Sequence, residues 1–67
     1  MNRVHYTVGG VRNAETKTAL KNALDDIDGV QMINVDAARG TVEIGYFDPA
    51  DETQIRNRIM EAGFTLG

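Results

Sequence analysis

Apolar residues recur along this chain with two different periods, which alternate in a fixed order. Over residues 3–8 every second position is apolar, as in a strand with one buried face, at Val4, Tyr6 and Val8. After residue 13 the spacing becomes that of an amphipathic helix, at Leu20, Ala23, Leu24 and Ile27. The same change of period occurs again in the second half of the chain. The pattern therefore predicts two strand-helix-strand units within 67 residues.

In the first half of the chain, the residues at the expected ends of the strand and the helix are types that favour such ends. Gly9-Gly10 ends the first strand, and Asn13 is the expected N-cap because its side-chain oxygen can accept a hydrogen bond from a free backbone N–H of the first turn. We expect the helix to end at Asp28-Gly29. A second strand is expected over residues 30–35, with Ile33 and Val35 pointing inward.

The second half repeats the scheme. Residues 36–40 end in glycine and suit a hairpin to a strand over residues 41–46. Asp51 followed by Gln54 resembles a capping box that begins a second helix, whose expected buried stripe is Ile55, Ile59 and Ala62. Gly63 is the expected end of that helix, and residues 64–66 are long enough for a last edge strand.

Two strand-helix-strand units joined by a hairpin define one arrangement. Each crossover is expected to be right-handed, and the hairpin makes the middle two strands antiparallel neighbours. We therefore predict an α+β ferredoxin-like βαββαβ sandwich: a four-stranded antiparallel sheet of order 4-1-3-2 with both helices on one face. Residues 1–67 are expected to form a single domain. The other sheet face is expected to be polar, with Arg3, His5, Thr7, Thr41 and Glu43.

Composition excludes several functions. The chain has no cysteine, so it cannot form disulfides, thiolate metal sites or thiol nucleophiles. Its net charge of −3 argues against nucleic-acid binding, and the outward strand positions hold no aromatic residue for stacking on RNA. No apolar run is long enough to span a bilayer or resembles a signal peptide, so we expect a cytoplasmic protein without membrane insertion.

Several motifs resemble heavy-metal-associated domains, the family that includes copper chaperones. That family begins V-x-G-M-x-C-x-x-C, followed by V-x-x-A-L, and this chain reads V-G-G-V-R-N-A-E-T from Val8, with A-L at Ala23-Leu24. The similarity continues through D-I-D-G-V, I-N-V-D, G-T-V-E-I-G-Y, D-P and I-x-x-x-I-x-x-A-G-F, which together cover nearly the whole chain. The resemblance implies the ferredoxin-like fold and a role in metal transport or detoxification.

The two ligand positions of the family are altered. Asn13 and Thr16 stand where the cysteines are expected, and Val11 replaces the usual methionine. Soft ions such as Cu(I) are held by thiolates, whereas an amide and a hydroxyl are neutral oxygen donors. We therefore expect no metal ligand, no cofactor and no soft-metal carriage at this loop, and we expect Asn13 and Thr16 to stabilise the start of the helix.

Basic residues follow the altered loop. The resemblance implies that this loop and helix face meet a partner, either a metal-transporting P-type ATPase or a related metal-binding domain. Arg12, Lys17 and Lys21 are the residues we expect to dock that partner through complementary charge. The hypothesis is a docking or regulatory module, as a monomer or weak homodimer.

Other residues suggest weaker alternatives. An ACT-like small-molecule-sensing domain shares the strand-helix-strand repeat, and a metallochaperone with unusual ligands is a second alternative. Gly9-Gly10 with Arg12 resembles an anion cradle such as that of acylphosphatases, but no nucleophile and base accompany it, so we expect no enzyme.

The remaining polar and sulfur-containing side chains have ordinary structural explanations. His5, the only histidine, is expected on the solvated sheet face, away from Asn13. Met32 and Met60 are expected to fill the core or an edge and not to act as thioether ligands. Four acidic residues are expected to form one solvated cluster, at Asp25, Asp26, Asp28 and Asp36.

Overall fold

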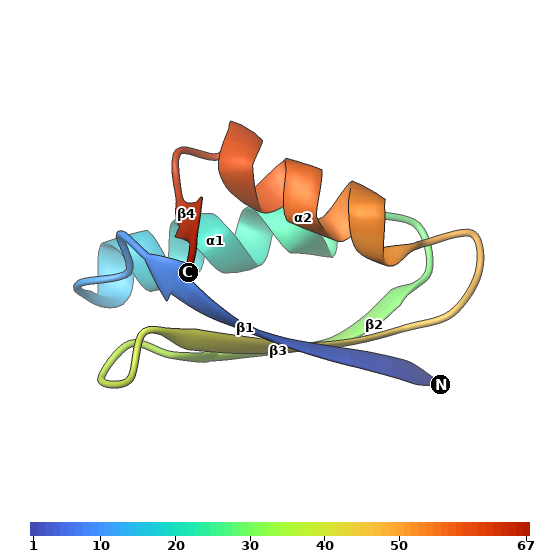
Figure 1. Ribbon diagram of the computed structural model, residues 1–67, viewed down its shortest axis with the longest axis horizontal. Coiled ribbons are helices and arrows are strands. Elements are labelled where there is room, and N and C mark those ends of the chain that lie inside the picture. Colours follow the sequence, from blue (N-terminus) through green and yellow to red (C-terminus); the bar gives the residue numbers. More distant parts are fainter.

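Alternation of apolar and polar side chains produces the expected sheet. The computed structural model describes residues 1–67, with two helices over one face of the sheet and no layer over the other (Figure 1). The elements in chain order are β1 (Asn2–Gly9), α1 (Ala14–Asp25), β2 (Val30–Asp36), β3 (Thr41–Tyr46), α2 (Glu52–Glu61) and β4 (Thr65–Leu66). The strands are antiparallel in the order β2-β3-β1-β4, which confirms the predicted 4-1-3-2 order and the ferredoxin-like sandwich.

The inner sheet face supplies about a third of the core residues. Val42 and Ile44 on β3 are fully buried, and Val8 on β1 is nearly so. The helices supply another third through four fully buried side chains, Leu20, Leu24, Ile55 and Ile59, and the loops and turns supply the rest. Burial of this apolar area against the sheet is the main favourable contribution to folding.

A bulge in β2 corrects its side-chain alternation. Val30 pairs with Tyr46, but Met32 pairs with Gly45, so one extra residue lies between consecutive partners. Without the bulge Val30 would share the outer face with Met32, because strand side chains alternate with period two. The bulge instead lets Val30 pack against the core.

Helix α1 ends a turn earlier than the sequence predicts. It stops at Asp25, with Asp26 as the C-cap, because carboxylates at this end oppose the helix dipole and Ile27 N–H donates to the Leu24 carbonyl at 3.2 Å. Gly29 lies in the following turn at φ +98°, where its carbonyl accepts a 2.8 Å hydrogen bond from Phe47 N–H. The buried Ile27 therefore belongs to a turn and not to the helix.

The end of α2 also differs from prediction in one residue. Ala62 is exposed, because it is the C-cap and lies past the buried stripe. Gly63 and Phe64 N–H groups donate to the carbonyls of Met60 and Ile59, at 3.0 and 3.3 Å, which is a Schellman motif. This motif turns the buried Phe64 into the core in place of Ala62. Neither helix is long and apolar enough to cross a membrane.

Candidate functional site

The loop between β1 and α1 is built from tightly constrained residues. Val11 is buried at the position of the family's methionine, and Gly10 has φ +107°. A Cβ on Gly10 would lie 3.1 Å from Phe64 Cδ1, so the Phe64 side chain lies directly beside the loop. The loop thus follows the end of β1 (Figure 1) and lies beside Phe64, two residues past the C-cap of α2.

Asn13 and Thr16 form a complete capping box at the start of α1. Thr16 N–H donates to Asn13 Oδ1 at 2.9 Å, and Thr16 Oγ1 accepts from Asn13 N–H at 3.1 Å. The Thr16 hydroxyl also accepts from Arg12 N–H at 2.8 Å. Its own proton has two acceptors within 3.1 Å, Asn13 O and Asn13 Oδ1. Asn13 is therefore the N-cap predicted from the sequence, and Thr16 completes the motif.

This arrangement does not fit the metal that the family resemblance implies. Both side chains offer neutral oxygens, and these oxygens already accept hydrogen bonds from backbone N–H groups. Binding an ion there would require loss of capping interactions worth about 0.5–2 kcal/mol, for donors that soft ions disfavour. Nor does the structure bring three His, Cys, Asp or Glu side chains together in a metal-binding cluster elsewhere.

The predicted docking residues lie along the start of α1. Arg12 immediately precedes the N-cap, and Lys17 and Lys21 lie one turn apart on the helix. All three side chains are exposed, and none forms an ion pair within the chain. Their charges are therefore available to an external acidic group. Arg3 and Arg56, on other surfaces, are also free of ion pairs.

The acidic residues do not form the single cluster expected from the sequence. Asp25, Asp26 and Asp28 lie at the end of α1, whereas Asp36 is at the far end of β2, roughly 20 Å along the strand from Val30. Asp36 instead pairs with Arg39 across the hairpin at 3.7 Å. The positions of these aspartates in the sequence did not reveal the distance between Asp36 and the other three, because that distance depends on the direction in which β2 runs away from the end of α1.

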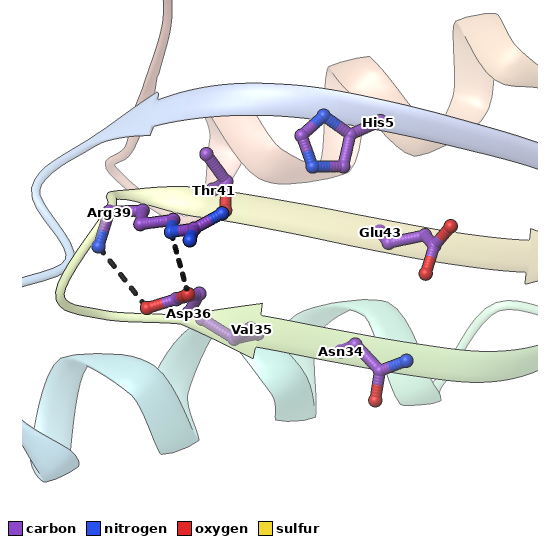
Figure 2. Close-up of a pocket in the computed structure, with 7 residues that line it drawn as sticks. All are labelled: His5, Asn34, Val35, Asp36, Arg39, Thr41 and Glu43. Atoms are coloured by element: carbon purple, nitrogen blue, oxygen red, sulfur yellow. Dashed lines mark hydrogen bonds and ion pairs between the residues drawn. The ribbon is translucent and has the colours of Figure 1, made fainter.

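A shallow polar depression lies on the outer sheet face (Figure 2). His5 on β1 is the register partner of Glu43 on β3, and Glu43 is the partner of Asn34 on β2. The structure thus places His5 on the outer face, where the sequence pattern had put it. The complete lining is His5, Asn34, Val35, Asp36, Arg39, Thr41 and Glu43. The sequence did not predict that Asp36 and Arg39 line this depression, because their position depends on the geometry of the hairpin between β2 and β3.

One side-chain contact between β1 and α2 was not predicted. Tyr6 donates a hydrogen bond from its hydroxyl to Glu52 Oε1 at 3.0 Å. Partial burial, and then the hydrogen bond and negative charge of Glu52, raise the pKa of Tyr6 well above its usual value. The sequence pattern placed Tyr6 on the inner face of its strand but could not predict Glu52 as its hydrogen-bond partner, because the two residues are far apart in sequence.

Comparison with known proteins supports the fold assignment. No family model and no curated protein sequence matches the chain. Among solved structures, the CopZ metallochaperone is 27% identical, with a TM-score of 0.93 over 98% of this chain and 100% of that one. A copper-binding domain of a P-type ATPase is 22% identical, with a TM-score of 0.93 over 100% and 92%. The PacS N-terminal domain from Synechocystis PCC6803 is 19% identical, with a TM-score of 0.88 over 100% and 96%.

The architecture and these similarities define a small ferredoxin-like domain whose structure is similar to that of a metallochaperone and of a copper-binding domain. The predicted resemblance to heavy-metal-associated domains is confirmed, and the cysteine pair of that family is absent from this chain.

Proposed function

We propose that this chain is a docking or regulatory module of a metal transport or detoxification system. In this proposal residues 1–67 act in the cytoplasm as one domain, monomeric or weakly dimeric, and carry no soft ion in the β1–α1 loop. The observation that carries the proposal is the capping box of Asn13 and Thr16, which occupies the ligand positions of an otherwise intact scaffold. No catalytic role is included.

The proposed partner is a metal-transporting P-type ATPase or a related metal-binding domain. Support comes from the structural neighbours, which include a copper-binding domain of a P-type ATPase. Unpaired cations at Arg12, Lys17 and Lys21 fit an acidic partner surface, since complementary charge steers encounter and sets orientation. An ACT-like sensor has less support, because two of these neighbours are named as a metallochaperone and a copper-binding domain.

Titration with a cysteine-containing metal-binding domain of a P-type ATPase tests the proposal. With the chain labelled by ¹⁵N, backbone shifts should centre on residues 10–21 and weaken as salt rises. A double variant, Lys17→Glu with Lys21→Glu, should lower affinity by roughly tenfold.

The matched control is the double variant Arg3→Glu with Arg56→Glu. It changes net charge by the same amount on other surfaces and should leave the affinity close to that of the unmodified chain. Equal loss in both double variants, or shifts that avoid residues 10–21, would contradict the proposed docking face.

A further inference from the structure

All sulfur in this chain is in its three methionines, and the sheet brings two of them to one place. Arg3, Gly45 and Met32 are register partners across β1, β3 and β2, on the uncovered outer face. A Cβ on Gly45 would lie 2.8 Å from Met1 Sδ and 3.3 Å from Met32 Cβ. The Met1 thioether therefore lies over the glycine, next to the Met32 side chain.

The bulge in β2 and the glycine in β3 create this pairing. Met32 lies on the outer face although Val30 packs inward, which is a consequence of the extra residue between them. Gly45 has no side chain to separate Met1 from Met32, and it is buried beneath them. Met32 is expected from the sequence to fill the core or an edge, and the structure places it partly buried on the outer face of β2, an edge strand of the sheet.

Thioether sulfur is a soft donor that favours ions such as Cu(I) over hard cations. Methionine side chains are flexible, and two bonds separate Cβ from Sδ, so the Met32 sulfur can turn toward the Met1 sulfur by a change of rotamer. Met1 is 54% exposed, so an ion from solvent can reach this residue. Arg3, opposite Gly45, repels a divalent cation twice as strongly as a monovalent one at the same distance.

We propose that the Met1 and Met32 thioethers form a site for a soft monovalent cation, Cu(I) or Ag(I), on the outer sheet face. The site is separate from the β1–α1 loop, and it does not depend on the docking function proposed above. It uses the sulfur that remains in a chain without cysteine. His5 is not a member, because its side chain lies in the polar depression of the next row (Figure 2).

Titration with Ag(I) in chloride-free buffer tests this site, with methionine methyl groups labelled by ¹³C and retention of Met1 confirmed by intact mass. The Met1 and Met32 methyl signals should shift together and saturate at one equivalent. The Met60 methyl should not move at those concentrations, although Met60 on α2 is half exposed. Met60 is therefore an internal control for binding by any accessible thioether.

Substitution provides the second arm. Met32→Leu preserves side-chain volume and should lower Ag(I) affinity by roughly tenfold or more, whereas Met60→Leu should leave it unchanged. Parallel shifts of all three methyl groups, or equal affinity in the Met32→Leu variant, would overturn the proposal. Ag(I)-dependent shifts confined to residues 10–17 would overturn it too, and would separately contradict the account of the loop.

Discussion

Thr16 and Asn13 exchange hydrogen bonds in both directions: Thr16 N–H donates to Asn13 Oδ1 at 2.9 Å, and Asn13 N–H donates to Thr16 Oγ1 at 3.1 Å. In heavy-metal-associated domains the equivalent positions hold the cysteine pair. Here the same two positions satisfy backbone groups that a helix start leaves without partners. The interaction that stabilises the loop is therefore internal to the chain.

Removal of this capping box should destabilise the fold. Asn13→Ala is expected to lower the free energy of unfolding by about 1 kcal/mol, because the first turn loses its side-chain acceptor. Thr16→Ala should have a similar effect, and the double variant should cost less than both single effects together, since they share one motif. Urea unfolding measures all three, with the exposed Thr18→Ala as control. Additive losses would show that the two residues act independently.

Stability at alkaline pH should depend on Tyr6. Its raised pKa in the folded state means that the unfolded chain loses the phenol proton first, near pH 10. The contribution of Tyr6 is therefore fully present below about pH 10 and decreases as pH rises above that value. In Tyr6→Phe this decrease should be absent, and stability at neutral pH should fall by about 0.5–1.5 kcal/mol with the lost hydrogen bond to Glu52.

Unfolding of both proteins by urea between pH 8 and pH 11.5 measures this difference. Parallel stability curves across that range would contradict the assignment of the pH dependence to Tyr6.

Arg58 should contribute more to stability than Arg39. Arg58 Nη1 donates to the Ala23 carbonyl at 3.1 Å and so joins α2 to α1, with its side chain 33% exposed. Arg58→Ala is expected to cost about 1–2 kcal/mol, because the carbonyl loses a charged donor and packing between the helices is reduced. Arg39→Ala should change stability by no more than about 0.5 kcal/mol, since its ion pair with Asp36 is exposed. Thermal unfolding of the two variants compares them, and equal losses would be inconsistent with this account.

Two glycines with similar backbone angles should respond differently to alanine. Gly29 and Gly63 have φ of +98° and +96°, so each substitution pays a strain of about 1 kcal/mol. A Cβ on Gly29 would also clash with the Phe47 carbonyl oxygen, whereas one on Gly63 would meet open space. Gly29→Ala should therefore be the more destabilising by at least about 1 kcal/mol, as chemical denaturation can show. Similar values would mean that the residue 47–50 loop moves aside.

The sequence predicted the topology because its side-chain periods are local and strict. Val42 and Ile44 alternate with outward residues, and Asn13 and Asp51 are strong N-caps, so the strands and helix starts were recognisable without tertiary information. The helix ends were less predictable, because early termination of α1 depends on the turn that packs Ile27 and Gly29 beside the Phe47 loop.

The contacts of the candidate sites were harder to predict than the fold. Residue types identified the altered ligand positions, but the reciprocal bonding of Thr16 with Asn13 depends on the geometry of the first turn. The approach of Met1 to Met32 depends on the sheet register and on the β2 bulge. Neither feature can be predicted from the alternation of apolar and polar residues within one strand.

Site-resolved titration with Cu(I) tests the central claim about the loop most directly. Under anaerobic conditions the backbone amides of residues 10–17 should show no saturable submicromolar binding in the unmodified chain. The double variant Asn13→Cys with Thr16→Cys restores two thiolates to the same scaffold and should acquire it. Tight, saturable shifts at residues 10–17 in the unmodified chain would contradict the account.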